Sequence, residues 1–377
     1  MVTLGIAVVI SNALGAAGRG EQSLILLGIS LVCLFTQVAG GSALVYLTPR
    51  FDGRQLIKAA YLWVLSSSVV FMLLNWGVSI LPHYGYHIVI LSFLNSSWNV
   101  LAFYLLGREK SSWYNALNFI NSFIALAYLF IKWKLFSLQI DDYPLALYLS
   151  HGITLLISLF GLKYIRSGEK VSVGTLFQKF IHHGGFIQLA NVAQLLKYRI
   201  HFYFIEIFLG TALLGIYANG VAVAEGVWII TRSLSVIQFS KVANLSNDQE
   251  ARKITNQYTW SSIGLSTLAT LVLLCFPDSL FSRIFGKEFL GIHDLLLYLS
   301  IAIISLSVSN LISHYFSGIG KNHLNFIGSL IGLLITAALG YILIPKYGLK
   351  GAAIASSVAF FGTAIFHVIL YQTTRRS

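Results

Sequence analysis

Ionisable side chains that could bind a substrate lie within two neighbouring apolar segments in the second half of the chain. At about 100° per residue, Gln194, Lys197 and His201 share one face of a helix. Arg199 and Glu206 share the nearly opposite face. A helix that is polar on two faces cannot lie against lipid, so this one must contact protein or a wet cavity on both sides.

The bases of these segments are predicted to bind an anion. Arg199 and Lys197 lie in one segment, and Arg232 lies in the next. An ionised side chain inside a membrane segment is a functional hypothesis by default, and a guanidinium group suits phosphate. We therefore expect the three bases to bind an anionic headgroup, with the amides of Gln194 and Asn191 as further ligands.

A structural role is the alternative for the same charges. Arg199 and Arg232 could instead pair with Glu206 and Glu225 across helices and hold the bundle together. Seven residues, about 10 Å along a helix axis, separate Glu225 from Arg232, so their partners must come from other helices. Glu225, His201 and Glu206 are also candidates for coupling transport to an ion, with a hydrogen-bonded core histidine as the plainer explanation of His201.

Motifs for catalysis or for a cofactor are missing from the sequence. Gly318-Ile319-Gly320-Lys321 is followed by Asn322 and lacks the spacing of a phosphate-binding loop, so ATP-driven transport by this chain alone is not expected. The pair His182-His183 points to different helix faces and predicts no metal site. Cys33 and Cys275 lie inside apolar runs and read as small core residues. We predict no enzyme activity, no metal and no cofactor.

The composition is that of a membrane protein. Of the 377 residues, 56% are hydrophobic and 10% charged, with a mean hydropathy of +0.77, whereas soluble domains carry about 25% charged residues. The net charge of +12 does not indicate a nucleic-acid partner, because the bases are scattered between apolar runs. Bases spaced in that way set the orientation of a chain in the bilayer. We predict an all-α integral membrane protein surrounded by membrane lipids.

Apolar runs of about 20 residues, the length that crosses a bilayer, predict about twelve spans. They are Met1–Ala17, Ser23–Leu47, Leu56–Leu81, Tyr86–Gly107, Tyr114–Ile131, Tyr143–Leu162, Phe180–Ile207, Leu213–Phe239, Tyr258–Phe276, Leu295–Phe316, Leu324–Ile344 and Gly351–Tyr371. Most Lys and Arg residues of the loops, including Arg375 and Arg376, fall on one side. That side is cytoplasmic by the positive-inside rule, so both termini are expected in the cytoplasm. Arg19, at the end of the first span, is expected to snorkel to the interface.

Two pairs of short matches indicate an internal repeat. Asn118-Phe119-Ile120-Asn121-Ser122 corresponds to Asn325-Phe326-Ile327-Gly328-Ser329, and each follows a Tyr-to-Gly lead, Tyr104–Gly107 or Tyr315–Gly318. Leu14-Gly15 with Gly18-Arg19-Gly20 corresponds to Leu209-Gly210 with Gly215. Both pairs align spans 1–6 with spans 7–12, which predicts a parallel repeat with the substrate path between the halves. We expect six-helix halves at 1–165 and 179–377, joined by a cytoplasmic linker at 166–178; coincidence in apolar sequence is the alternative.

Several longer motifs resemble those of polysaccharide (Wzx-type, O-antigen) flippases in the multidrug/oligosaccharidyl-lipid/polysaccharide exporter superfamily. In chain order they are Leu14-Gly15-Ala16-Ala17-Gly18-Arg19-Gly20-Glu21, Tyr198-Arg199, Leu214-Gly215-Ile216-Tyr217-Ala218-Asn219-Gly220, Ala224-Glu225-Gly226-Val227-Trp228, Ile284-Phe285-Gly286-Lys287-Glu288-Phe289 and Ile344-Pro345-Lys346-Tyr347-Gly348-Leu349-Lys350-Gly351-Ala352-Ala353. The resemblance covers nearly the whole chain. The sequence departs from the family pattern at His201, where members often carry Asp, and lacks the amphipathic lead-in before span one, so a late gene start or a truncation is expected.

The resemblance implies a V-shaped transporter like the multidrug and toxin extruders (MATE). Its implied function is to move an undecaprenyl-pyrophosphate-linked oligosaccharide, an O-antigen, capsule or exopolysaccharide repeat unit, from the inner to the outer leaflet of the bacterial inner membrane by alternating access. A glycan polymerase and a chain-length regulator are the implied protein partners. A MATE-like multidrug extruder is the first alternative, although cationic drugs favour acidic cavities. A membrane glycan polymerase or transferase is the second.

Overall fold

The structure is a computed structural model that describes residues 2–78, 84–245 and 247–374. Met1 of the first expected span, the last residues of the third, Leu56–Leu81, and the bases Arg375 and Arg376 lie outside the described residues. Within those ranges the chain is helical apart from loops and one isolated parallel bridge between Phe51 and Glu169.

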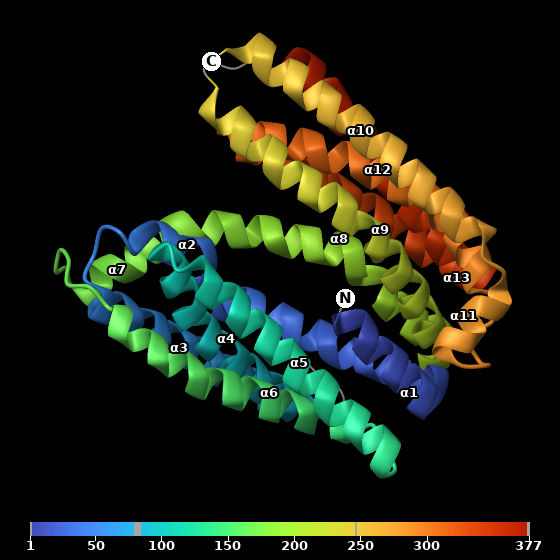
Figure 1. Cartoon of the computed structure of the whole chain (residues 1–377), viewed down its shortest axis with the longest axis horizontal. Helices are drawn as coiled ribbons and strands as arrows, with labels where there is room; N and C mark the ends of the chain where they lie inside the picture. Colours follow the sequence, from blue (N-terminus) through green and yellow to red (C-terminus); the bar gives the residue numbers. More distant parts are fainter. Residues whose placement is uncertain (1, 79–83, 246, 375–377) are drawn as a thin grey trace. The chain divides into compact units, whose positions relative to one another are not determined.

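The helices follow one another in the order shown in Figure 1. They are α1 (Val2–Thr36), α2 (Gly41–Leu47), α3 (Gly53–Val78), α4 (Gly85–Gly107), α5 (Ser111–Leu135), α6 (Asp142–Leu159), η1 (Phe160–Tyr164), α7 (Val173–Phe180), η2 (Ile181–Gly185), α8 (Phe186–Leu209), α9 (Thr211–Asn244), α10 (Asp248–Cys275), α11 (Asp278–Phe285), α12 (Ile292–Gly318) and α13 (Asn322–Thr373). The predicted all-α fold class is confirmed.

Nine helices of the described chain are long and apolar enough to cross a membrane. Two of these helices are interrupted by a glycine with positive φ: Gly15 (φ 69°) in α1 and Gly348 (φ 60°) in α13. Gly348 separates the two expected spans of α13, and Gly15 lies close to the expected end of the first span at Ala17. The second expected span, Ser23–Leu47, is divided between α1, which ends at Thr36, and α2. The helix α8 covers most of the seventh expected span, whose first residues lie in α7 and η2.

The residues form two compact units. The N-terminal unit comprises Val2–Val9 and Gln22–Val192, and the C-terminal unit comprises Ile10–Glu21 and Ala193–Ser377. The units divide within α8, between Val192 and Ala193.

In the N-terminal unit, α4 packs against α3, α5 and α6 (Figure 1). The helix α7 begins inside the stretch 166–178 that was expected to be a linker, and its Leu176 and Phe180 are buried in a core with Leu44, Leu56 and Tyr104. Apolar side chains thus fix this stretch to the N-terminal unit.

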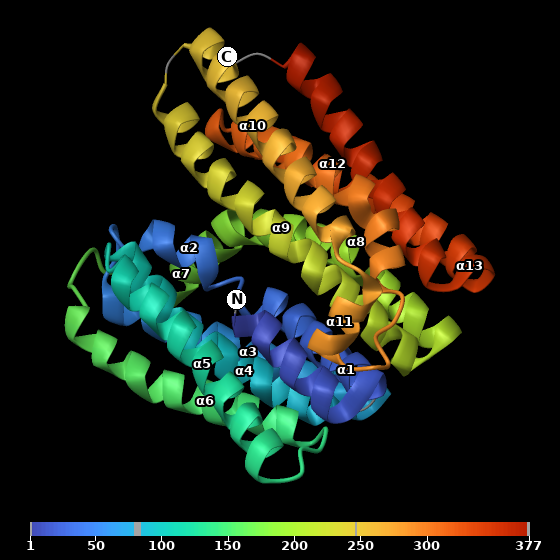
Figure 2. The same cartoon turned by 45° about the vertical axis from the view of Figure 1, so that its right-hand side comes forward.

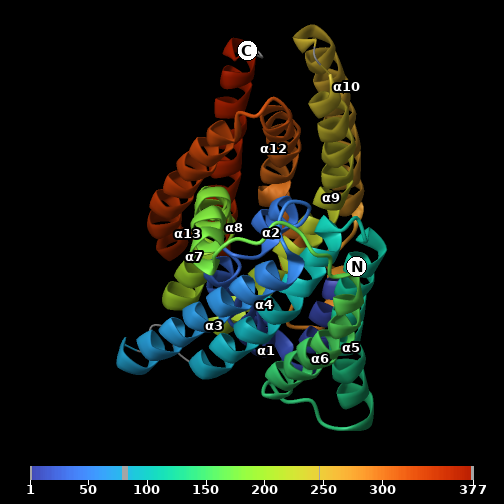
Figure 3. The same ribbon diagram turned by 90° about the vertical axis from the view of Figure 1, so that its left-hand side faces the viewer.

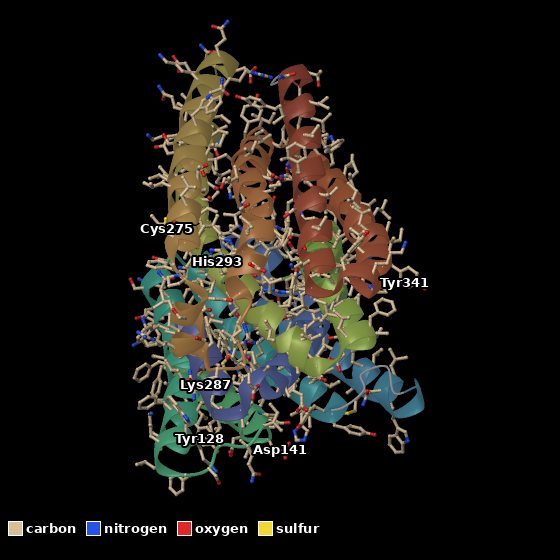
Figure 4. All side chains as sticks on the ribbon, turned by 90° about the vertical axis from the view of Figure 1, so that its right-hand side faces the viewer. Tyr128, Asp141, Cys275, Lys287, His293 and Tyr341 are labelled. Atoms are coloured by element: carbon tan, nitrogen blue, oxygen red, sulfur yellow. The ribbon has the colours of Figure 1, made fainter. Side chains whose placement is uncertain are left out.

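In the C-terminal unit, α12 packs against α9, α10 and α13, which run alongside it in Figures 2 and 3. Hydroxyls join three of these helices internally: the Thr231 hydroxyl of α9 lies 3.1 Å from the Ser266 hydroxyl of α10 and 3.1 Å from the Ser307 hydroxyl of α12. On α13, Tyr341 is exposed and its ring contacts those of Phe204 and Phe208 of α8 (Figure 4). The hydroxyl cluster therefore holds α9, α10 and α12 together through uncharged side chains.

Equivalent contacts recur in the two units. In the N-terminal unit, the Trp98 indole on α4 donates to Nδ1 of His151 on α6 at 3.3 Å. In the C-terminal unit, the Ser309 hydroxyl on α12 lies 2.8 Å from Nδ1 of His367 on α13. Trp98 and Ser309 are related by the same offset of 211 residues as Tyr104–Gly107 and Tyr315–Gly318. These paired contacts support the internal repeat.

The segment Ile10–Glu21 packs on the start of α9 through the glycines of the second sequence match. A Cβ added to Gly20 would lie 2.0 Å from the Thr211 carbonyl oxygen, and one added to Gly215 would lie 1.9 Å from the Ala16 carbonyl oxygen. Arg19 is buried here, and its Nε donates to Oδ1 of Asn219 at 2.7 Å. The expected snorkelling of Arg19 is therefore wrong, since an amide acceptor inside the unit binds its head.

Candidate substrate site

The helix α8 carries most of the predicted site residues. It is not among the nine helices that are long and apolar enough to cross a membrane, and Lys197, Arg199 and Glu206 interrupt its apolar residues. Aromatic contacts hold it against two neighbours: the Tyr198 ring lies 5.8 Å from Trp228 of α9 and 5.2 Å from Phe360 of α13. Protein thus covers more than one face of α8, as the two-faced polarity predicts.

Lys197 is a buried cation, with 4% of its surface exposed. Its Nζ lies 5.1 Å from the centroid of the Tyr198 ring and 5.4 Å from that of Phe360. Gly332 of α13 makes room for the stem, since a Cβ there would lie 2.4 Å from Lys197 Cδ. No carboxylate of a described residue lies within ion-pair distance. Aromatic faces offset only about 1–2 kcal/mol of the cost of burying such a charge.

Arg199 forms an ion pair with Glu225, which lies on α9. Its Nη2 is 2.6 Å from Glu225 Oε1, and its guanidinium also stacks on Phe202 at 5.0 Å. The two charged side chains are 26% and 34% exposed, so the pair is half-buried. In this conformation Arg199 is therefore paired with an acid of another helix, as the structural alternative predicts, although the pair remains accessible to solvent.

A small aromatic pocket lies between these two cations. Tyr198, Trp228 and Phe360 line it together with the Glu225 carboxylate, and its volume is about 20 Å³. Tyr198 and Phe360 contact Lys197 on one side, whereas Glu225 contacts Arg199 on the other. The pocket has room for about one water molecule.

The remaining candidates for ion coupling, His201 and Glu206, are packed within the C-terminal unit. The His201 ring meets the Tyr217 ring edge-on at 5.3 Å, and its buried Nδ1 has no hydrogen-bond partner among the described residues. Glu206 Oε1 accepts a bond from the Thr211 hydroxyl at 2.8 Å, while its Oε2 is buried without a described partner. Both side chains retain unused hydrogen-bonding capacity.

Two further predicted residues, Gln194 and Arg232, are exposed but lie near Tyr198, to which Gln194 is hydrogen-bonded. Arg232 forms no ion pair with a described acid. Asn191 belongs to the N-terminal unit, where its Nδ2 donates to Oε1 of Gln188 at 2.9 Å. Gln188 in turn donates to the Gln37 carbonyl at 3.2 Å. The structure thus places every predicted site residue except Asn191 in the C-terminal unit.

A larger polar cavity of about 440 Å³ lies inside the N-terminal unit. Side chains of α1, α4, α5 and α6 line it, with Gln37 just after α1. Its lining includes six carboxamides but no Asp, Glu, Lys or Arg among the described residues.

Comparison with known proteins identifies relatives in glycan biosynthesis. The capsular polysaccharide biosynthesis protein CapF of Staphylococcus aureus is 26% identical over 171 residues, 45% of this chain and 43% of CapF. The probable low-salt glycan biosynthesis flippase Agl15 of Haloferax volcanii is 26% identical over 167 residues, 43% of this chain and 35% of Agl15. The chain thus spans less than half the length of the curated relatives it matches. No model of a known protein family matches it.

Solved structures match over nearly the whole chain. The inward closed conformation of the lipid II flippase MurJ superposes with a TM-score of 0.80 at 13% identity, covering 98% of this chain and 85% of MurJ. An inward-facing multidrug resistance MATE family transporter of the MOP superfamily gives 0.75 at 12%, covering 99% and 93%. The chain has the fold of the MOP exporters. The resemblance predicted from the sequence is confirmed, and these structural neighbours are transporters and flippases, not enzymes.

Sequence reasoning missed the polar cavity of the N-terminal unit. Asn118 and Asn121 were noticed only as part of a repeat, yet their spacing of three places both amides on one helix face. Asn95 and Asn99, four apart inside the apolar run Tyr86–Gly107, carry the same signal. Amides at helical spacing in spans that have no charge were the available clue.

The Arg199–Glu225 pair predicts a compensating double variant. Replacing either residue with Gln leaves the other charge half-buried and unpaired, which we expect to cost about 1–3 kcal/mol, between the values for exposed and buried pairs. The double variant R199Q/E225Q should recover most of that loss. Thermal unfolding of the purified protein measures all three, with R232Q as the exposed control. Additive losses in the double variant would contradict the pairing.

Proposed function

We propose that the exporter is a flippase for a lipid-linked oligosaccharide, moving an undecaprenyl-pyrophosphate-linked glycan repeat unit from the inner to the outer leaflet by alternating access. The observation that carries the proposal is Lys197, a buried cation that no described carboxylate neutralises. A pyrophosphate that enters low-dielectric surroundings needs such charges, because an unpaired anion there is prohibitively costly.

Arg199 and Glu225 give this proposal a coupling step. A pyrophosphate bound by Lys197 would compete with Glu225 for the Arg199 guanidinium, since their ion pair is half-open to solvent. Glu225, once released, would be a free carboxylate that accepts a proton or a sodium ion. Glu225 is therefore our leading candidate for ion coupling, ahead of His201 and Glu206.

The proposal also includes a cellular arrangement. We place the exporter in the bacterial inner membrane with both termini in the cytoplasm, from its excess of bases in the corresponding loops. The two six-helix halves, 1–165 and 179–377, would be the moving bodies. The names of CapF and Agl15 support a glycan pathway, in which a polymerase and a chain-length regulator would act on the translocated units.

Vesicles containing the purified chain test the flippase proposal. Undecaprenyl pyrophosphate linked to a fluorescent oligosaccharide is placed in both leaflets, and dithionite is added outside to bleach the dye. In protein-free vesicles about half of the signal should persist; with the exporter, nearly all should be lost as inner-leaflet lipid crosses. Persistence of the inner half in vesicles shown to contain the protein would contradict the proposal.

Export of organic cations is the second candidate function. The rings of Tyr198, Trp228 and Phe360 beside the Glu225 carboxylate resemble a cage for a cation. Its volume of about 20 Å³ is well below the roughly 300–1,000 Å³ of sites for drug-sized ligands, and Arg199 already occupies the carboxylate. Transport of ethidium but not of the glycan lipid in the same vesicles would favour this function.

A further inference from the structure

The cavity of the N-terminal unit has the size and chemistry of a ligand site. Its volume of about 440 Å³ lies within the roughly 300–1,000 Å³ typical of small-molecule pockets. The spanning helices α1, α4, α5 and α6 surround it, so its polar groups lie away from the loops. Polar side chains at this depth are tolerated where they line a wet cavity, and they mark functional sites by default.

The amides of this cavity are held by their N–H groups. Asn99 Nδ2 donates to Oδ1 of Asn95 at 2.9 Å, and Asn95 Nδ2 donates to Sγ of Cys33 at 3.2 Å. Asn118 Nδ2 donates to the Tyr114 carbonyl at 2.8 Å, and Asn121 Nδ2 lies 2.9 Å from Nδ1 of His151. The Oδ1 atoms of Asn99, Asn118 and Asn121 accept no hydrogen bond from a described residue. The cavity therefore presents fixed acceptors to a ligand that donates.

The imidazole of His151, which lines the cavity, is uncharged. Nδ1 of His151 faces two donors, the Trp98 indole at 3.3 Å and the Asn121 amide at 2.9 Å, so it must be the acceptor. The ring proton is then on Nε2, as in uncharged imidazole. With no Asp, Glu, Lys or Arg among its described lining residues, the cavity suits an uncharged ligand rather than a metal ion, an organic cation or a phosphate.

The internal repeat shows that the fold does not require the amide of Asn121, although Asn118 has an amide counterpart in Asn325. In the C-terminal unit, Gly328 stands where Asn121 stands in the N-terminal unit, and His367 packs directly on it: a Cβ there would lie 2.3 Å from His367 Nε2. In the C-terminal unit the corresponding helices therefore pack together with no amide at the position of Asn121. Asn121 is an addition to one unit only, as expected of a binding residue.

We infer that this cavity binds the neutral sugar rings of the transported glycan, a deduction that rests on the proposed flippase function. Sugar hydroxyls donate to the free amide oxygens and accept from amide N–H groups, and the partly apolar ring faces can lie against Trp98 and Tyr143, which also line the cavity. An apolar ligand would leave the amides unpaired. The N-terminal unit thus recognises the glycan, and the cations of α8 bind the pyrophosphate.

Cys33 allows the site to be tested directly. It lines the cavity, and the chain's other cysteine is Cys275, an exposed residue at the end of α10 (Figure 4). In a C275S background, we expect free neutral disaccharides of gluco- and galacto-configuration at millimolar concentration to slow alkylation of Cys33 by a small maleimide at least about 3-fold. Ethidium and inorganic pyrophosphate should not slow it. If none of the disaccharides slows alkylation of Cys33, the inference is overturned.

Binding to lipids separates the two proposals. Affinities are measured in nanodiscs for undecaprenyl pyrophosphate with and without a neutral disaccharide. N99L and N121L should weaken binding of the glycan lipid about 10-fold or more. Both variants should bind the sugar-free lipid as the wild type does, which shows that they are folded. The control variant is N115L, at an exposed position of α5. Equal affinity of the wild type for both lipids overturns the glycan inference alone. If the wild type binds neither lipid, the flippase proposal fails, and the Cys33 experiment still decides the cavity.

Discussion

Replacing Gly215 with Ala should unfold or severely loosen the C-terminal unit. The added Cβ would lie 1.9 Å from the Ala16 carbonyl oxygen, 2.8 Å from its carbon and 3.0 Å from the Gly20 nitrogen. All three are main-chain atoms, which cannot rotate away as the end of a side chain does. Overpacking commonly costs about 1–3 kcal/mol, and we expect this substitution to reach or exceed the upper value because a whole helical segment must move.

The contact is sensitive because both sides of it are built from glycines. Gly20 faces the Thr211 carbonyl oxygen just as Gly215 faces that of Ala16, so neither backbone can withdraw without losing the opposite contact. Two side-chain bonds join the same segment to α9: Asn219 Nδ2 donates to the Ser11 hydroxyl at 2.8 Å, and Arg19 Nε donates to Asn219 Oδ1 at 2.7 Å. Their loss adds to the cost of the clash.

Gly226 provides a matched control on the same helix. A Cβ there would meet no atom within 4 Å, and Ala is favoured over Gly in a helix by about 1 kcal/mol. Thermal unfolding of the purified protein should therefore show G215A several degrees below the wild type and G226A level with it or above. Equal unfolding temperatures for the two variants would show that Ile10–Glu21 does not pack against α9 as described.

Helix existence could be predicted from the sequence because it depends on local apolar length. Runs of about 20 apolar residues mark spans whatever their neighbours are, and the described part of each of the twelve expected spans is largely helical. Helix interruptions were less predictable. Gly15 breaks α1 whereas the nearby Gly18 and Gly20 are helical, and only packing decides which of three glycines adopts positive φ.

The composition of the candidate site was predictable only in part. Charge in an apolar run identifies Lys197 and Arg199 as unusual, but not which of them has an acid beside it. Arg199 and Glu225 are 26 positions apart on different helices, so their pairing depends on how α8 packs on α9. The cavity of the N-terminal unit was missed for a related reason: the uncharged amides of α1, α4 and α5 indicate a site only when the tertiary structure brings them together.

Replacing Lys197 with Met should stabilise the protein and abolish transport. Met nearly matches the shape of the lysine stem beside Gly332 and keeps contact with the Tyr198 and Phe360 rings. It also removes a buried charge that no described carboxylate compensates, a cost that exceeds the 1–2 kcal/mol lost with the aromatic contacts. We therefore expect the unfolding temperature to rise by a few degrees. Losing one charge-assisted contact to the pyrophosphate costs about 2–4 kcal/mol, or about 30- to 1,000-fold in transport rate.

The opposite signs of these two effects distinguish the interpretations of Lys197. If the lysine only braced the bundle, K197M would lower the unfolding temperature, and transport would fall no further than the amount of folded protein. If the lysine binds the substrate, K197M should have a higher unfolding temperature than the wild type. Its vesicles should keep the dithionite-protected half of the glycan lipid, because transport is lost. K241M, which replaces an exposed lysine at the end of α9, controls for the loss of one positive charge and should change neither quantity. A residue retained at the expense of stability is expected where function requires it, and a K197M variant that is both less stable and fully active would remove Lys197 from the site.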